Sequence, residues 1–229
     1  MVFCINERIQ EETIIKKFLI VFFLSGVLTQ LYAESPQNFS FTFHAGPYLP
    51  ENISGYSAIY GKANKLLFEL ETEWQFLRLF GKLGIGAGIG YMRDGGYGVF
   101  ASDQTPSQLR FSFQVIPARA TLYYRADYFK SQFFVPFGEF GYDYYYFNEN
   151  SSGGGHSFSG GRDGYHYGGG LQFLLDIFDK KNAGSMDTDY GVNNTFLSLE
   201  YRISKVNDFG KGVWDFSSKT WFAGLMFEF

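Results

Sequence analysis

LFELETEWQF (67–76) and KLGIGAGIGY (82–91) decide the fold of this chain. In both stretches two kinds of side chain alternate, and a period of two is the geometry of a β-strand, whose successive side chains point to opposite faces. One face of the predicted hairpin is apolar throughout, whereas the other carries carboxylates in the first stretch and glycines in the second. Glycine weakens a strand, so four at alternate positions indicate that bulky neighbours must be accommodated there. A narrow closed barrel with a polar interior is such a place.

The composition agrees with one all-β domain of barrel size. The chain has 229 residues, and aromatic residues (21%) outnumber charged ones (18%), which favours strands over helices. The net charge of −4 offers no basic surface for nucleic acid. The single cysteine, Cys4, lies in a segment that we expect to be removed, so no cysteine-based metal or redox site is predicted. No cofactor is implied.

Residues 1–33 are predicted to be a secretory signal peptide, a helix that precedes a mature barrel of residues 34–229. Lys16 and Lys17 come before the apolar run FLIVFFLSGVL (18–28), and a small residue, Ala33, ends the segment. The run is short for a membrane-spanning helix, which needs about 20 apolar residues. A retained signal anchor is the alternative interpretation.

Eight segments of the mature chain show alternating patterns. We expect strands at 38–48, 67–76, 82–91, 108–126, 133–147, 165–176, 195–205 and 218–229. The apolar face changes parity at Ile116-Pro117, and proline lacks the ladder N–H, so a β-bulge is predicted there. The segment 177–194 breaks the rhythm and could hold one or two helical turns. Ten strands would require 177–194 or 49–64 to pair as well.

The predicted connections are long at one rim and short at the other, which is typical of outer-membrane barrels. The long ones are 49–64, 93–107, 148–164 and 206–217. A soluble barrel would place the apolar face inside, but eight strands enclose just enough room for side chains to fill. So many aromatic groups do not fit there, whereas the face of glycine, serine and charges does. We therefore predict an eight-stranded antiparallel up-and-down β-barrel, integral to the bacterial outer membrane.

The C-terminal residues resemble the signature that the barrel assembly machinery recognises, with apolar side chains at alternate positions: Trp221, Leu225, Phe227 and Phe229. Several longer runs are similar to a family of outer-membrane barrels known from myxobacteria. These runs are AGPYLP (45–50), LLFELETEWQFLR (66–78), GKLGIGAGIGY (81–91), GGLQFLLDIFD (169–179) and GVNNTFLSLEYR (191–202). The resemblance implies location and fold, and it carries over no functional site.

Charged side chains of both signs share the polar face, and we expect them to form an ion-pair network that fills the lumen. The network is predicted to comprise Glu69, Glu71, Glu73, Lys82, Arg110, Arg119, Arg125, Glu139, Asp143, Glu200 and Arg202. A narrow charged conduit, a proton-responsive interior and a catalytic carboxylate pair are the alternatives.

The remaining motifs favour no enzyme. His156-Ser157 lies in a predicted flexible loop, and neither His166 nor His44 belongs to a nucleophile motif, so His44 is interpreted as a lumen hydrogen-bonding residue. The run 187–191 (DTDYG) resembles the start of a calcium loop, but its glycine comes one position early and no glutamate follows, which favours turn chemistry. No catalytic or metal-binding residue is predicted.

The predicted long loops are rich in aromatic residues: Tyr56, Tyr60, Tyr97, Phe100, Phe158, Phe209, Trp214 and Phe216. Such side chains either bind a partner or belong to a membrane-interface girdle. We predict a structural or surface-binding role through these loops, with 148–164 contacting an extracellular ligand or lipopolysaccharide. A porin-like channel and a lipid-modifying enzyme are the alternatives, and the oligomeric state stays open.

Overall fold

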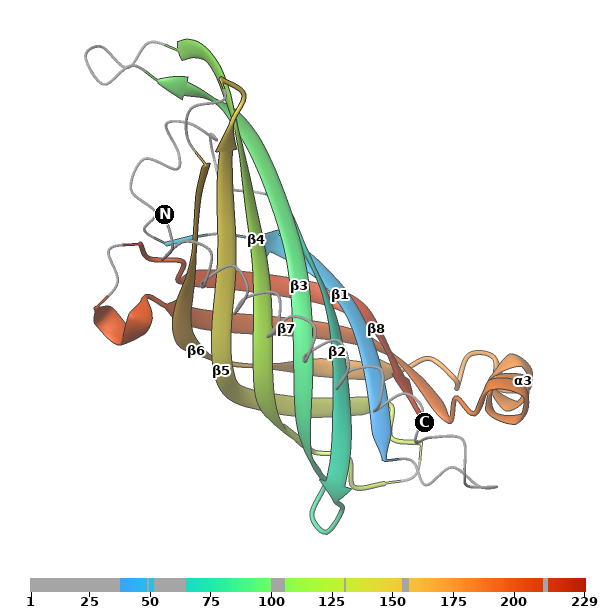
Figure 1. Ribbon diagram of the computed structural model, residues 1–229. Helices are drawn as coiled ribbons and strands as arrows, with labels where there is room; N and C mark the ends of the chain where they lie inside the picture. Colours follow the sequence, from blue (N-terminus) through green and yellow to red (C-terminus); the bar gives the residue numbers. More distant parts are fainter. Residues whose placement is uncertain are drawn as a thin grey trace, which may run out of the picture. The chain divides into compact units, whose positions relative to one another are not determined.

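The computed structural model is a closed antiparallel barrel of eight strands in which each strand pairs with its sequence neighbours and β8 pairs with β1 (Figure 1). It describes residues 38–48, 50–51, 65–99, 106–129, 131–153, 157–211 and 214–229, so the predicted signal peptide lies outside the described residues. The strands are β1 Phe39–Tyr48, β2 Lys65–Leu77, β3 Lys82–Val99, β4 Pro106–Arg125, β5 Phe134–Ser151, β6 Ser157–Leu174, β7 Asn194–Val206 and β8 Ser218–Glu228. The predicted fold class is confirmed. Within the described part of the chain, no helix has the length and apolarity to cross a membrane.

The apolar face of the wall points outward. On β2, Leu70 and Trp74 expose 39% and 50% of their surface, whereas Glu71 and Glu73 between them expose 7% and 3%. Other strands follow the same rule, with outward aromatic or aliphatic groups such as Phe140 and Trp221. An apolar outer band around a polar lumen is the arrangement of a membrane barrel, in which lipid covers the outer face.

The predicted bulge at Ile116-Pro117 is wrong. β4 pairs with β5 in one register from Phe111↔Ser151 to Arg125↔Phe137, so no residue is inserted at Pro117. Pro117 lies on the inner face and is buried. The apparent change of face has another cause: the inner side chains of β4 are polar from Arg125 to Arg119 and apolar at Val115 and Phe113.

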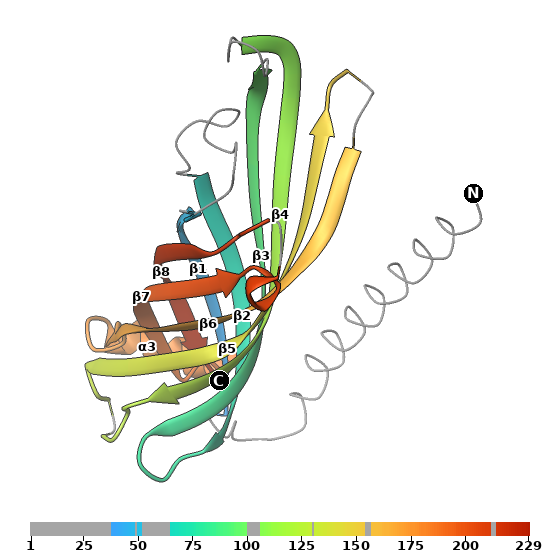
Figure 2. The ribbon, with the colours of Figure 1, turned by 90° about the vertical axis from the view of Figure 1, so that its left-hand side faces the viewer.

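Two predicted loops, 93–107 and 148–164, are largely strand. β3 and β4 stay paired up to Val99↔Pro106, and β5 and β6 up to Asn150↔Ser157. Their neighbours stop earlier, because β7 pairs with β6 only from Gly164 onward. The two hairpins therefore continue beyond the closed barrel as a four-stranded sheet, visible as long arms in Figure 2. We call this the projecting sheet (93–99, 106–114, 148–151 and 157–163). Glycine, serine and asparagine suggested loops there, but cross-strand pairing overrides their low strand propensity.

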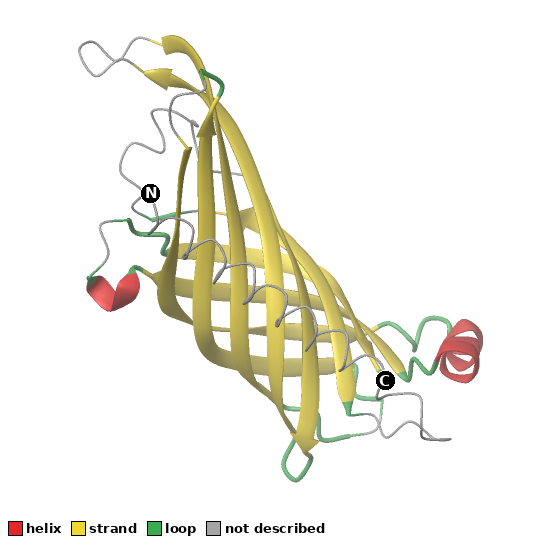
Figure 3. Ribbon diagram, viewed as in Figure 1, coloured by secondary structure: helices red, strands yellow, loops and turns green. Residues whose placement is uncertain are grey.

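The barrel has two distinct ends. The loop end carries the connections β1–β2, β3–β4, β5–β6 and β7–β8, and the turn end carries the other three together with the C-terminus. The connection β6–β7 holds helix α3 (Lys180–Tyr190), capped by Asp179 at its start and by Gly191 at its end. This glycine has a φ of 70°, so the motif that resembles a calcium loop is a helix C-cap. The 3₁₀ helix η2 (Asp208–Gly210) lies at the opposite end from α3 (Figure 3).

The lumen is filled in layers. Its loop end is closed by buried apolar side chains, which we call the apolar plug: Tyr48, Leu67, Met92, Phe113, Val115, Tyr145, Phe147, Val206, Phe216 and Phe222. A smaller apolar cluster lies toward the turn end and comprises Val135, Leu174, Phe196 and Met226. Charged and polar side chains occupy the space between these two layers.

Candidate functional site: an ionic network across the lumen

Glycines on β3 let charged side chains from its two neighbours meet. The inward positions of β3 include Gly84, Gly86, Gly88 and Gly90, and each pairs with a polar residue of β2. Gly88 lies in register between Glu71 of β2 and Arg119 of β4. A Cβ added to Gly88 would lie 2.7 Å from Cγ of Glu71, because this glutamate leans over the glycine. The alternating glycines noted in the sequence are thus gaps through which β2 reaches β4.

Arg119 is the main partner on the β4 side. Its guanidinium contacts both carboxylate oxygens of Glu69, each at 2.5 Å, which is the bidentate geometry that favours arginine over lysine. The Nε atom of Arg119 lies 3.3 Å from Asp143 of β5. Four residues further along β4, on the same inner face, Tyr123 donates a hydrogen bond of 2.5 Å to Glu71. These contacts fix the β2 carboxylates over β3.

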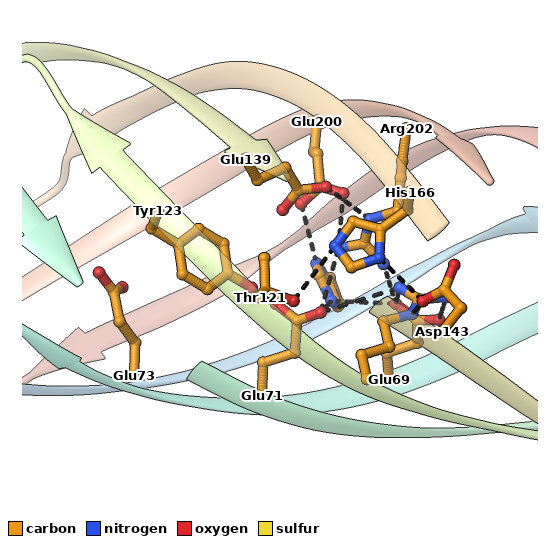
Figure 4. Close-up of polar contacts among 12 residues, drawn as sticks. Glu69, Glu71, Glu73, Thr121, Tyr123, Glu139, Asp143, His166, Glu200 and Arg202 are labelled. Carbon is orange, nitrogen blue, oxygen red and sulfur yellow. Dashed lines mark hydrogen bonds and ion pairs between the residues drawn. The ribbon is translucent and has the colours of Figure 1, made fainter. Parts of the chain in front are cut away.

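The same arrangement recurs on the other side of the barrel. Gly168 of β6 lies in register between Glu139 of β5 and Arg202 of β7. The Nε atom of Arg202 donates to Glu139 at 2.6 Å across this gap, and its other nitrogens reach Glu69 at 2.7 Å and Glu200 at 2.7 Å (Figure 4). Arg202 exposes only 1% of its surface. One guanidinium therefore joins carboxylates from β2, β5 and its own strand.

Carboxylates outnumber arginines in this layer, and a histidine lies among three of these carboxylates. His44 of β1 has Nε2 at 3.3 Å from Glu69 and 3.6 Å from Glu71, and Nδ1 at 3.6 Å from Glu200. The interpretation of His44 as a lumen residue agrees with this position. Glu69, Glu71 and His44 could also offer metal-ligand atoms that lie within 4.8 Å of one another. Both carboxylates already accept from Arg119 or Arg202, so a cation would have to compete with the arginines.

A hydroxyl, an imidazole and a carboxylate stand in series beside this network. Oγ1 of Thr121 lies 3.2 Å from Nε2 of His166, and Nδ1 of His166 lies 2.8 Å from Asp143. Gly141 separates Thr121 from His166 in the register, so a third glycine gap makes the contact possible. The order is that of a nucleophile triad. Thr121, His166 and Asp143 are all buried, so the arrangement has no exposed hydroxyl to offer a substrate.

Lys82 and Arg110, two members of the predicted network, lie apart from its centre. Lys82 is at the turn end, where its Nζ atom contacts Glu228 at 2.5 Å and Asp127 at 2.7 Å. Arg110 is not in the lumen: it is exposed on the projecting sheet, with its guanidinium 5.2 Å from the centre of the Tyr97 ring. Its placement on the polar face followed from the wrong bulge, because a continuous β4 puts Arg110 and Arg119 on opposite faces.

The structure brings together the other nine predicted members in the buried interior: Glu69, Glu71, Glu73, Arg119, Arg125, Glu139, Asp143, Glu200 and Arg202. Arg125 pairs with Glu73, again across β3. Sequence reasoning missed Glu228, Thr121 and the pairing of His166. The inward parity of β8 could have indicated Glu228, whereas the Thr121–His166 contact depends on the register of three strands.

Stacked aromatic rings close the loop end. The rings of Phe113 and Phe216 are parallel with centroids 6.1 Å apart, and Phe147 lies 4.8 Å from Phe216. The hydroxyl of Tyr48 donates to the carbonyl of Phe216 at 3.1 Å, which holds the β7–β8 connection in the mouth. Phe158 and Trp214 extend the stack outward, with 5.6 Å between their centroids.

The other aromatic residues from the predicted loops lie on the outer surface where the structure describes them. Phe209 is 60% exposed and stacks on Tyr165 of the outer wall, and Tyr97 also faces outward. Trp221, of the C-terminal signature, is 64% exposed and lies against Tyr201. Phe227 and Phe229 are half-buried on the same strand and at its end. Four residues of the sequence analysis, Tyr56, Tyr60, Phe100 and His156, lie outside the described residues.

A closed eight-stranded barrel with an apolar wall and a filled polar lumen defines an integral β-barrel protein of the bacterial outer membrane. Solved structures of that class resemble it. The outer membrane protein OprG of Pseudomonas aeruginosa superimposes with a TM-score of 0.55, at 13% identity over 84% of this chain and 95% of the other.

Neisserial surface protein A gives a TM-score of 0.49 at 14% identity, and the attachment invasion locus protein Ail of Yersinia pestis gives 0.45 at 18%. In both cases the match covers 84% of this chain and 97% of the other. No family model matches the chain, and no curated protein does. The likeness to OprG, at 13% identity, shows the fold alone, and the resemblance to myxobacterial barrels stays a prediction.

Proposed function

We propose that the protein binds an extended polypeptide segment outside the cell, through the open edge of its projecting sheet. The observation that carries this proposal is the end of pairing on one side of β6. β7 pairs with β6 from Gly164 onward, whereas residues 157–163 stay paired with β5 and have no strand on their other side among the residues described. An unpaired edge offers backbone N–H and C=O groups that a further strand can bind.

The direction of these groups follows from the ladder. The N–H of Leu174 donates to Phe133 on the β5 side, whereas the N–H of Asp163 donates to the side chain of Asp208 on the other side. Successive residues of a strand alternate in this respect. Ser157, Ser159 and Gly161 therefore direct their N–H groups to the open side. Ser157 and Ser159 are exposed, so a peptide can reach them.

The surroundings of the edge suit a peptide with apolar side chains. Phe158 is 46% exposed and lies beside Trp214 above the mouth of the barrel. Arg162 lies over the ring of Phe147 and pairs with Asp208 at 3.3 Å. Main-chain hydrogen bonds would supply the affinity for the peptide, and the rings of Phe158 and Trp214 would select among peptide side chains, as in other cases of strand addition. This end is taken as extracellular because long extensions of outer-membrane barrels lie there.

Ser159→Pro tests the proposal. Proline removes the outward N–H and is tolerated at an edge, so the β5–β6 ladder stays intact. A phage-displayed library of short random peptides would be selected on the intact protein in nanodiscs. We expect enriched peptides with alternating apolar residues, which bind Ser159→Ala normally and Ser159→Pro weakly. Peptides that bind all three forms equally would contradict the proposal.

The filled lumen favours binding over the two alternatives. A conduit needs a continuous path, but the apolar plug and the ionic network occupy the axis. A lipid-modifying enzyme needs an accessible nucleophile or base, and the Thr121–His166–Asp143 series is buried. The barrel assembly machinery stays a proposed partner through Phe229 and the outward residues of β8.

A further inference from the structure

A hollow of about 420 Å³ lies on the outer wall at the loop end, where β2 meets β3. It is lined by Lys65, Leu66, Phe68, Tyr91 and Arg93. Leu66, Phe68 and Tyr91 are each about half exposed, at 54%, 45% and 44%, so the floor of the hollow is apolar and open to the membrane. Its upper border is cationic. This combination fits an amphipathic ligand with an apolar chain and an anionic head.

Two of the cations above the hollow have no carboxylate partner in the described part of the chain. Arg93 donates from Nε to the hydroxyl of Ser112 at 3.1 Å, and the two terminal nitrogens of its guanidinium form no ion pair with a described residue. Arg110 lies over Tyr97 and pairs with no acidic side chain among the described residues. Both side chains are exposed. The third cation, Lys65, lies 3.4 Å from Asp94.

The strand register places a recess between these two arginines. On the outer face of β3, Gly95 stands between Arg93 and Tyr97, and it pairs with Ser112 of β4. Tyr97 in turn pairs with Arg110, so the two arginines flank the glycine from neighbouring strands. A Cβ added to Gly95 would meet only the carbonyl of Phe111, at 3.6 Å. The recess therefore has an open floor, a hydroxyl and two guanidinium groups.

The height of the recess on the wall indicates the ligand. Below it, the outer face of β2 and β3 is apolar through Phe68 and Ile89, whereas Arg93 is the first outward charge after Tyr91. Aromatic residues followed by cations mark the boundary of the hydrocarbon region. Arginine binds phosphate through paired N–H donors. We propose that Arg93 and Arg110 bind the phosphate of an outer-leaflet lipid whose acyl chain lies in the hollow.

Native mass spectrometry of the detergent-solubilised protein can test this proposal with phosphorylated lipid A, its dephosphorylated form and inorganic phosphate as probes. The test variant is Arg93→Gln/Arg110→Gln. The control is Lys211→Gln/Lys219→Gln, which removes the same charge from other exposed positions at the loop end. We expect the test variant to lose affinity for phosphorylated lipid A by about tenfold or more, which is the effect of one lost charge-assisted contact, and the control to keep it.

Three results would overturn the proposal. Equal losses in both double variants would show an effect of net charge alone. Equal binding of phosphorylated and dephosphorylated lipid by the intact protein would leave the arginines without a role. Displacement of the lipid by inorganic phosphate alone would make this a site for free phosphate. Heat-modifiable migration of both variants establishes that the barrel is folded, and neither arginine is needed for its interior.

Discussion

Arg202 of β7 donates to Glu69 of β2 at 2.7 Å, although β8 and β1 lie between these strands in the closed barrel. The contact spans the lumen rather than following its wall. Both side chains are buried, at 1% and 2% exposure, so neither charge has water as an alternative partner. The interior is thus a set of cross-braces between strands that share no backbone hydrogen bond.

Replacing Arg202 should destabilise the barrel strongly. Arg202→Met leaves the buried carboxylates of Glu69, Glu139 and Glu200 without their shared partner, and breaking such a pair costs about 3–5 kcal/mol. Reversible urea unfolding in lipid vesicles measures the loss. Arg110→Met is the matched control, and it should change the free energy of unfolding by less than about 0.5 kcal/mol because Arg110 is exposed. Similar losses of unfolding free energy in both variants would contradict the interpretation that Arg202 holds the strands together across the lumen.

A side chain at Gly168 should also weaken folding. The added Cβ of Gly168→Ala would lie 2.6 Å from the carbonyl of Tyr201 and 2.9 Å from Glu139, so the backbone or the ion pair must shift. Overpacking of this kind costs about 1–3 kcal/mol. Gly184→Ala in α3 is the control: nothing lies within 4 Å, and alanine favours a helix by up to about 1 kcal/mol. A neutral Gly168→Ala would show that the gap is not needed.

The orientation of the wall predicts unequal costs on its two faces. Leu70→Arg and Leu225→Arg place a charge against lipid near the middle of their strands, which should cost about 2–4 kcal/mol. Ser198→Ala on the lumen face of β7 should cost less, because it removes only a hydroxyl. The same unfolding assay compares them, and equal costs would mean that the faces are inverted.

The filled lumen predicts the absence of a large, stable conductance in planar bilayers. The plug closes the loop end and Lys82, Glu228 and Asp127 occupy the turn end. Recording beside a general porin, reconstituted in the same way, provides the control. A reproducible porin-like step that Glu71→Gln makes less cation-selective would establish a conduit instead.

Acid should release the start of the β1–β2 connection. Hydrogen bonds from Lys205 and, next, from Lys219 at 2.6 Å lower the pKa of Glu51 below its usual value. The stabilisation is therefore complete above the unfolded pKa, about 4.3, and is lost as the pH falls through the lower folded value. The N–H of Glu51 donates to the carbonyl of Ser217, and its protection from hydrogen exchange, taken relative to the intrinsic rate at each pH, should fall there. Glu51→Gln should abolish this pH dependence, and an unchanged profile in the variant would refute the assignment.

The sequence predicted the wall well and the details of the lumen poorly. Alternation identifies each strand and the direction of its faces, because lipid imposes one chemistry along the whole outer surface, as at Leu70 and Trp74. The interior obeys no such uniform rule. Val115 and Phe113 face inward beside Arg119, and this change of chemistry along one face imitated a bulge at Pro117. Likewise, Gly160 and Gly161 suggested a loop, because pairing with β5 is a tertiary property that local composition does not contain.

The glycine gaps also bear on how the strands find their alignment. A strand that slips by two residues keeps its apolar side chains toward the lipid, so burial in the membrane cannot distinguish the two alignments. The ionic ties can distinguish them. A slip of β3 along β2 would carry β4 with it and move Arg119 away from Glu69, and a slip of β6 along β5 would carry β7 with it and move Arg202 away from Glu139. Each of these ion pairs joins two strands that are separated by a third, so one change of register affects three strands together. The buried charges would therefore destabilise misaligned barrels during insertion, although the apolar outer face of such barrels would still match the membrane.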